Sequence, residues 1–377
     1  MVGGESAHHE ARARAARAGR TTPRRKRPLR RLLATPPAAQ QGQHNRGRHV
    51  GDPAKHPRRA RARPPEVALV DFSSTPEQEE LRAGARGYLA DHPQPSWAEL
   101  AALGWTGVSV PEADGGAGLG FLEEAVLFEE MGRALTHAPY WSTVAVVLPA
   151  LPADLRAEVA RGEASWTLAT GPLVTDLDSA TRVAYVGGDS IWELVGADRE
   201  VLQTNDMTRP LGVVSGGEAG RRLSGSEVLP RLRTRSLTAL SLEACGVGAR
   251  ALELAVDHAG QRLQFGKPIG TYQAVAHPLA TTLLALDLGR SLALFAAWCI
   301  ATDDPRAAIA AAAAKSHCAE AAVAACERSI QVHGGIGFTW EHVLHRLYKR
   351  ALGIQSWEAS SERLRAEIAE HLLGRGI

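Results

Sequence analysis

The stretch that decides the fold is Arg262-Leu-Gln-Phe-Gly-Lys-Pro-Ile-Gly270-Thr-Tyr-Gln273, which lies between two long runs of periodic apolar residues. It combines an Arg, a Gln-Phe pair, a turn rich in Gly and Pro, and the start of a second helix. A guanidinium offers forked donors and a helix start offers free backbone N–H groups, so a corner of this kind can hold a diphosphate. By its residues alone the corner predicts anion binding only moderately, because basic residues and glycines are common at turns.

Long helical patterns surround this corner. Apolar residues keep a helical spacing over Leu237 to Leu263, Tyr272 to about Ala301, and Pro305 to Val332. Three helices of this length favour a helix bundle. The third carries a run of alanines that ends at Lys315, and its high helix propensity and small side chains favour close packing. Two shorter helices are expected after a glycine-rich break that begins at His333.

The segment before the bundle divides into a helical part and a strand-rich part. Thr75-Pro-Glu-Gln predicts a capped helix that continues to about Ala90, because Pro follows the Thr cap and Gln stands three residues after it. Further helices are expected over 96–103, 121–135 and 137–160.

From about Trp166 to Leu232, β-branched residues alternate with polar residues and glycines become frequent, which is typical of two-faced strands. The expected fold class is therefore α+β. We expect an N-terminal α-helical domain over 70–160, a small central β-domain over 161–234 and a C-terminal four-helix bundle over 235–377.

Residues 1–69 differ from the rest of the chain in charge. They hold 17 of the 43 basic residues but only 4 of the 41 acidic ones, so the remainder is acidic. Their Arg, Pro, Ala, Gly and His composition predicts a disordered tail, because it has little apolar surface to bury. Three interpretations stay open: a nucleic-acid or membrane-binding arm, a targeting peptide, or a tail that is not naturally made because the true start is Val70.

Composition also bounds the location of the protein. Cys245, Cys299, Cys318 and Cys326 show no C-x-x-C spacing and lie in helical patterns, so we expect buried free thiols in a reducing compartment. We find no apolar run of the length of a membrane span. We therefore expect a cytoplasmic protein that binds neither membranes nor, given its acidic body, nucleic acid.

The motif Arg-x-Gln-Phe-Gly-Lys-Pro-Ile-Gly resembles a signature of the acyl-CoA dehydrogenase family, which contacts the FAD of a neighbouring subunit. A second resemblance lies about seventy residues later, at Gln331-Val-His-Gly-Gly-Ile-Gly-Phe338. Family members place this turn against the adenosine side of FAD across a dimer interface, and consecutive glycines permit such a close approach. The resemblance covers Val70 to Ile377. It implies FAD-binding roles for Arg262, Gln264, Phe265, Gln273, Gln331, Gly334 and Gly335.

The reaction implied by the resemblance is α,β-desaturation of an acyl-CoA thioester, with electrons passed to an electron-transfer flavoprotein. A carboxylate removes the α-proton while hydride leaves the β-carbon, so the base should be desolvated and its pKa moved toward neutrality. Glu358 follows Phe338 by twenty residues, which is the family's register for this base, and Trp357 stands where an aromatic residue usually precedes it. Glu358 could instead begin the last helix, where an acidic residue is favoured. Glu243 is a lesser candidate that could simply pack or pair near the bundle.

Other family features are only partly kept. Members usually carry a Thr-Glu-Pro…Gly-Ser-Asp loop against the flavin, whereas this chain has Trp166-Thr-Leu-Ala-Thr-Gly-Pro-Leu-Val-Thr-Asp176. Leu237 lies nearest the register of an Arg that often begins the long C-terminal helix. Two assemblies therefore stay open. One is a homodimer or homotetramer that is active by itself. The other is a heterotetramer with a related chain, as in bacterial sterol side-chain degradation, to which this chain supplies architecture and adenosine-side contacts.

Three histidines near the glycine break could suggest a metal centre. His333, His342 and His345 straddle a loop, with spacings of nine and three residues and without a Cys or paired-carboxylate pattern. This spacing favours polar loop and helix-surface histidines, so no metal is expected.

Overall fold

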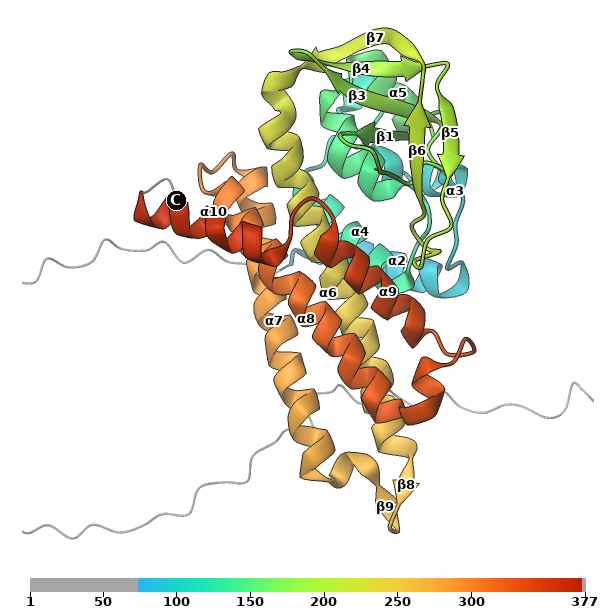
Figure 1. The fold of residues 1–377 in the computed structure, drawn as a ribbon, viewed down its shortest axis with the longest axis vertical. Helices are drawn as coiled ribbons and strands as arrows, with labels where there is room; N and C mark the ends of the chain where they lie inside the picture. The colour runs from blue at the N-terminus through green and yellow to red at the C-terminus, as the bar shows by residue number, and fades with distance from the viewer. Residues whose placement is uncertain (1–73, 375–377) are drawn as a thin grey trace, which may run out of the picture. The chain divides into compact units, whose positions relative to one another are not determined.

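A computed structural model describes residues 74–374 of the chain (Figure 1). The basic tail over 1–69 and the proposed start at Val70 lie outside the described residues. The order of elements is helices, then short strands, then long helices, which confirms the expected α+β class.

The first part is helical and begins as the capping pattern predicts. The Thr75 hydroxyl accepts a hydrogen bond from the Gln78 N–H, and the Gln78 side chain accepts one from the Thr75 N–H. The expected continuous helix over 137–160 is wrong, because Pro149 and Pro152 interrupt it. The elements are α2 (Pro76–Asp91), α3 (Trp97–Ala102), α4 (Phe121–Ala134), a π-helical turn η4 (Trp141–Val147), a 3-10 turn η5 (Leu148–Ala150) and α5 (Ala153–Ala160).

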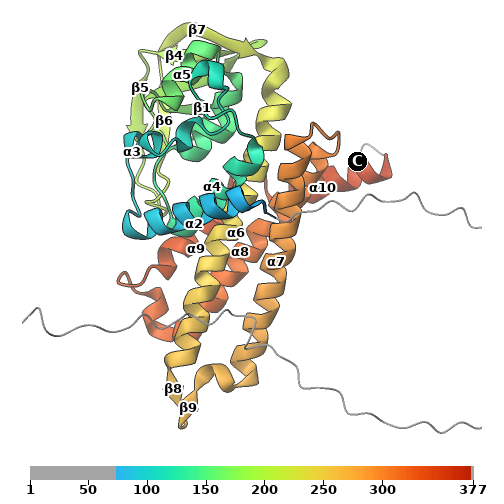
Figure 2. The same ribbon diagram turned by 180° about the vertical axis from the view of Figure 1, so that it is seen from behind.

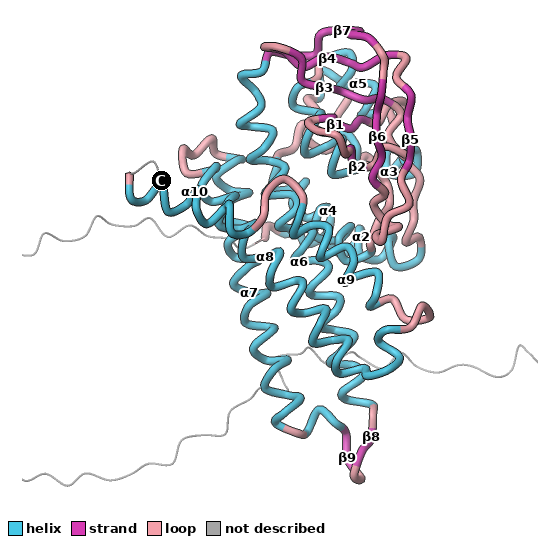
Figure 3. The backbone as a smooth tube through the Cα atoms, viewed as in Figure 1, coloured by secondary structure: helices cyan, strands magenta, loops and turns pink. Residues whose placement is uncertain are grey.

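The strand-rich part forms two small sheets, which Figure 3 shows together beyond one end of the long helices. One sheet has the order β1-β3-β4-β7, in which β1 and β3 are parallel, and the other has the antiparallel order β2-β6-β5. The strands are β1 (Trp166–Ala169), β2 (Val174–Thr175), β3 (Arg182–Gly187), β4 (Ser190–Val195), β5 (Asp198–Val201), β6 (Leu211–Ser215) and β7 (Glu218–Gly225).

Long helices form the C-terminal bundle. Helices α6, α7 and α8 run side by side, and α9 packs on α6 and α8 (Figures 1 and 2). Helix α6 begins at Leu229, earlier than the expected Leu237, and Pro230 lies in its first turn, where proline is tolerated. The elements are α6 (Leu229–Gln261), the hairpin β8 (Leu263–Gln264) and β9 (Lys267–Pro268), α7 (Gln273–Ala301), α8 (Ala307–His333), α9 (Leu344–Ser356) and α10 (Ser361–Leu373).

Two glycines let α4 and α6 touch backbone to backbone. A Cβ added to Gly246 would lie 1.9 Å from the Glu129 carbonyl oxygen, and one added to Gly132 would lie 2.3 Å from the Glu243 carbonyl oxygen. Only residues without a Cβ fit this crossing. The crossing fixes the part of α6 that carries Glu243 against α4.

The expectation that no segment is long and apolar enough to span a membrane is wrong for helix α7. By length and composition it is apolar enough to do so. It packs on α6 and α8, however, and the core helix of a soluble bundle meets the same criterion. Its outer side leaves Leu284 and Leu288 66% and 56% exposed. Apolar residues exposed in this way are typical of a surface that meets another chain. The four cysteines are free and buried, as expected.

Candidate functional site

The corner between α6 and α7 is a tight hairpin whose tip is exposed. Phe265 and Gly266 adopt left-handed conformations with φ of 52° and 79°. The Tyr272 hydroxyl donates to the Gln264 carbonyl oxygen over 3.1 Å, and the Lys267 ammonium lies 4.3 Å from the centre of the Tyr272 ring. Several contacts thus stabilise a hairpin that leaves the Phe265 ring 93% exposed. A ring held in this way is suited to contact another molecule.

The second expected motif lies beside this hairpin. Gln331, near the end of α8, lines a groove of about 550 Å³ together with Gln264 and Phe265. Helix α8 ends at Gly334, whose φ is 65°, and neither Gly334 nor Gly335 has an atom within 4 Å of an added Cβ. The two motifs therefore meet in space although they are far apart in sequence. Gln273, Gly334, Gly335 and Arg262 lie at the same helix ends but do not line the groove.

Arg328 is a groove residue that the motifs did not reveal. It precedes Gln331 by three residues, so both lie on the same face of α8, and this spacing was the available signal. The groove has apolar walls from Ile269, Val275 and Leu279 and a positive charge from Arg328.

The donor set around the groove fits the expected dinucleotide. The Arg262 side chain is exposed, and it forms no hydrogen bond or ion pair with any residue that the structure describes. Its guanidinium is free to bind a diphosphate, the amides of Gln264 and Gln331 can bind polar groups, and the apolar walls can hold a flat base. By their chemistry these residues can hold the adenosine diphosphate part of FAD.

Glu358 lies in the turn between α9 and α10, at a φ of 64°. The Ser236 hydroxyl donates to its Oε1 over 2.6 Å. Ser360 rather than Glu358 caps α10, because its hydroxyl accepts the Arg363 N–H. Glu358 as a whole is exposed to solvent, which differs from the desolvated base that the sequence led us to expect. The reason is its place in an open turn rather than within the bundle.

A buried lysine lies behind this turn. Lys315 is fully buried in α8, and its ammonium lies 3.5 Å from the Ala359 carbonyl oxygen. Burial lowers the pKa of Lys315 to about 8, and the charge of Glu358 opposes this change. One sequence feature marks this residue, which is a single cation at the end of an alanine run.

Arg209 lines two spaces of very different size. One is a groove of about 630 Å³, whose walls also include Leu211, Phe338, Trp340 and Tyr348. The other lies between α4, η4, α6 and α9 and encloses only about 10 Å³. A cavity of this size is at the limit for a single water molecule, so it has no room for an acyl chain.

Arginine side chains line the smaller space. Arg209 lies 5.2 Å and 4.9 Å from the ring centres of Trp141 and Trp357. It forms ion pairs with Asp176 at 3.3 Å and Glu243 at 2.9 Å.

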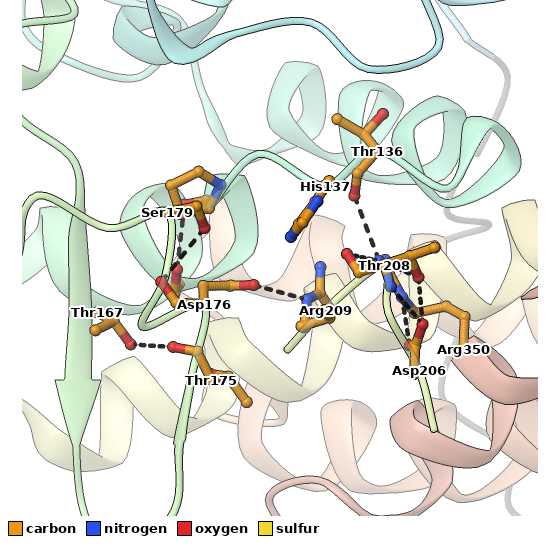
Figure 4. A network of polar contacts seen from close by, with 12 residues as sticks. Thr136, His137, Thr167, Thr175, Asp176, Ser179, Asp206, Thr208, Arg209 and Arg350 are labelled. Carbon is orange, nitrogen blue, oxygen red and sulfur yellow. Dashed lines mark hydrogen bonds and ion pairs between the residues drawn. The ribbon is translucent and has the colours of Figure 1, made fainter. Parts of the chain in front are cut away.

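Arg350 completes the network. It pairs with Glu243. Figure 4 shows that it also pairs with Asp206, at 3.1 Å, and donates to the Thr208 carbonyl and hydroxyl oxygens. Burial alone would raise the pKa of the Glu243 carboxyl, but the charges of Arg209 and Arg350 outweigh it and hold the pKa below its ordinary value. Glu243 is therefore a paired carboxylate in the core, which agrees with the interpretation that it packs or pairs near the bundle.

Two family patterns match parts of this chain. The family pattern "Acyl-CoA dehydrogenase, N-terminal domain" matches residues 75–152, and "Acyl-CoA dehydrogenase, C-terminal domain" matches residues 234–373. Acyl-CoA dehydrogenase FadE34 of Mycobacterium tuberculosis is 34% identical over 79% of this chain, which spans 45% of that protein's length. Acyl-CoA dehydrogenase IpdE2 of the same organism is 32% identical over 71% of this chain and 84% of its own length.

Solved structures show the same fold. A variant of the Tcur3481-Tcur3483 steroid ACAD has a TM-score of 0.71 at 25% identity, over 79% of this chain and 98% of that one. The ChsE4-ChsE5 complex from Mycobacterium tuberculosis has a TM-score of 0.74 at 22% identity, over 82% and 100%. Since the helical parts on both sides of the strands match one family, the chain belongs to the acyl-CoA dehydrogenases, a family of FAD-binding oxidoreductases.

Proposed function

We propose that this chain is one subunit of a heteromeric, FAD-dependent acyl-CoA dehydrogenase that desaturates the α,β bond of an acyl-CoA thioester. In this assembly the free end of its bundle contributes to the FAD site of a neighbouring, related subunit. The observation that carries the proposal is the exposed hairpin. The Phe265 ring is 93% exposed although it lies edge-to-face with Tyr272, and the exposed Arg262 side chain forms no hydrogen bond or ion pair with the residues that the structure describes.

Each residue at this end has a specific task. The Arg262 guanidinium binds and neutralises the diphosphate, while Gln264 and Gln331 bind polar groups of the adenosine side. The backbone of the Gly334-Gly335 turn can approach closely because neither glycine has an atom within 4 Å of an added Cβ. When bound, FAD supplies the hydride acceptor. The residues of this chain orient it and exclude water from its adenosine end.

The closed space lined by Arg209 and Trp141 supports the heteromeric form. An acyl chain entering there would have to displace Arg209 from two tryptophan rings and from two carboxylates. Separating such buried charges costs several kcal/mol, on the order of 3–5 kcal/mol. We therefore assign acyl-CoA binding and proton abstraction to the related subunit. The two-chain names of the ChsE4-ChsE5 and Tcur3481-Tcur3483 neighbours are consistent with this assembly.

The relatives also bear on the substrate and the electron acceptor. One solved neighbour is named a steroid ACAD. We propose an acyl-CoA from lipid or sterol side-chain degradation as the substrate. An electron-transfer flavoprotein would reoxidise the flavin in the cytoplasm.

A second candidate is a homo-oligomer that is active by itself, with Glu358 as the base. Two observations favour it. Ser236 holds the Glu358 carboxylate through a short hydrogen bond, and the open groove of about 630 Å³ that Trp357 lines could hold a flavin ring.

Expression of the chain alone and together with a related chain from the same genome separates the two candidates. The heteromer predicts that the chain alone is colourless or unstable. It further predicts that the co-expressed pair is yellow and bleaches with an acyl-CoA. A yellow protein that bleaches when this chain is purified alone would overturn the heteromer and support the homo-oligomer.

A further inference from the structure

Three imidazole rings form a stack next to Gly334, in which the His258 and His333 rings are stacked and the His342 ring is tilted by 55° to the His333 ring. His258 lies in the last turn of α6, His333 is the last residue of α8, and His342 lies in the loop before α9. The ring centres of His258 and His333 are 4.4 Å apart, and those of His333 and His342 are 4.6 Å apart. Within residues 74–374 no group of three or more His, Cys, Asp or Glu is arranged to hold a metal ion, so metal binding does not explain the stack.

Hydrogen bonds define where this stack can take up a proton. The Ser329 carbonyl oxygen can only accept, so His333 Nδ1, 2.8 Å away, carries a proton and donates it. The Leu344 N–H can only donate, so His342 Nδ1 is its acceptor at 3.2 Å. Protonation of His342 at Nδ1 would break that bond. The open positions are therefore His333 Nε2 and the His258 ring.

The charges that face the stack are predominantly positive. Burial lowers the pKa of His258, and His333 and Arg262 lower it further. Burial likewise lowers the pKa of His342, with further contributions from His333, His258, Arg250 and His345.

The remaining charged groups do not offset this excess. On α9, Lys349 and Arg346 act on His345 in the same direction. The carboxylates nearby are otherwise engaged, because Glu253 pairs with Arg250 and Arg133, and Glu341 accepts a hydrogen bond from Thr339. Without an added anion, burial and the surrounding positive charges thus disfavour protonation of His258 and His342.

We infer that this stack is a proton-linked part of the FAD site, so that a diphosphate bound at Arg262 and the Gly334 turn draws a proton onto the imidazoles. The inference rests on the proposed function, since it takes the anion to be the diphosphate of a neighbouring subunit's FAD. A nearby negative charge favours imidazolium, and so do the C-terminal ends of α6 and α8.

The sign of the linkage follows from this arrangement. Bound FAD favours the protonated form of the His258 ring, so FAD binding takes up a proton between the pKa of this ring without FAD and its pKa with FAD. By reciprocity, FAD binds more tightly as the pH falls through that window. One proton taken up changes the dissociation constant by up to about tenfold per pH unit.

The test is the FAD dissociation constant of the complete oligomer, measured by flavin fluorescence between about pH 6 and 8.5. We expect tighter binding at lower pH, and a flatter pH dependence for His258→Gln and for His333→Gln. His371→Gln on α10, an exposed residue, is the matched control and should keep the wild-type slope. Variants that keep the wild-type slope, or a wild type without a slope, would overturn the inference.

Calorimetry of the wild type in two buffers with different ionisation enthalpies measures proton uptake directly and needs no variant. Uptake of less than about a tenth of a proton across the whole range contradicts the inference. Arg262→Ala distinguishes a failure of the proposed function from a failure of the stack inference. If it leaves FAD affinity unchanged at every pH, the proposed function fails. If it weakens FAD while the histidine variants keep the wild-type slope, only the stack inference fails.

Discussion

The hydroxyl of Ser236 donates a 2.6 Å hydrogen bond to Oε1 of Glu358, which lies 122 residues later in the chain. Ser236 is buried in α6, and Glu358 lies in the turn between α9 and α10. The bond therefore connects the turn between α9 and α10 to the bundle. It also holds the carboxylate by a neutral donor, with the buried Lys315 ammonium close behind it.

In the heteromer, Glu358→Gln should leave the rate of acyl-CoA desaturation unchanged. The proposed base lies in the related subunit, and a glutamine oxygen can still accept the Ser236 hydroxyl. Single-turnover bleaching of the flavin measures this rate. A fall of about a hundredfold or more, the range expected for loss of a general base, would move the base to Glu358.

Glu243→Gln should destabilise the fold by about 3–5 kcal/mol, because it leaves Arg209 and Arg350 buried with one fewer negative partner. Urea unfolding at pH 7 measures this loss. Since the folded-state pKa of Glu243 is lowered, its contribution is present above the ordinary carboxyl pKa and is lost as the pH falls.

Glu320→Gln is the matched control for Glu243→Gln. It removes one carboxylate from an exposed pair with Arg365, so it should cost less than about 1 kcal/mol. Equal losses for the two variants would contradict the role assigned to the buried network.

Lys315→Met should make the protein at least as stable as the wild type at pH 7, because methionine fills the site without a buried ammonium. The pKa of Lys315 is lowered from 10.5 to about 8 in the folded state. The unfolded chain therefore binds more protons between these values, and wild-type stability rises with pH across them.

The advantage of Lys315→Met should shrink by about 3 kcal/mol from pH 8 to 10.5. Denaturant unfolding of both proteins at pH 7, 9 and 10 measures it. A constant difference would show that folding does not lower the pKa of Lys315, and it would contradict this prediction.

Gly246→Ala should destabilise the protein by about 1–3 kcal/mol or more, because the new Cβ would meet the Glu129 carbonyl oxygen at the α4–α6 crossing. Gly260→Ala in the same helix has nothing within 4 Å of its Cβ. It should be neutral or stabilise by about 0.5–1 kcal/mol. The difference between the unfolding temperatures of the two variants checks this prediction. Equal unfolding temperatures would show that α4 and α6 do not touch at Gly246.

The sequence revealed those parts of the fold and site that depend on local pattern. The capped start at Thr75 and the long helices follow from spacing along one segment. The corner at Arg262 and the turn at Gly334 follow from short motifs. The meeting of Gln264 and Gln331 in one groove was accessible only through the family resemblance, because nothing in the local sequence brings these two residues together.

The buried charges could not be predicted in the same way. Arg209, Glu243 and Arg350 come from three separate segments, and charged residues are ordinarily expected at the surface. The exposure of Glu358 was also missed, because register places a residue along the chain but does not show what covers it. The histidines were interpreted as surface residues, since their stacking depends on where α6 and α8 end.

The measurement that tests the central claim most directly is the FAD content of the purified oligomer with Arg262→Ala in this chain. Arg363→Ala on α10, whose side chain is 72% exposed, is the matched control. We predict that Arg262→Ala loses FAD during gel filtration while the subunits remain associated, and that Arg363→Ala retains FAD. An Arg262→Ala oligomer that keeps the full flavin absorbance of the wild type would contradict the account.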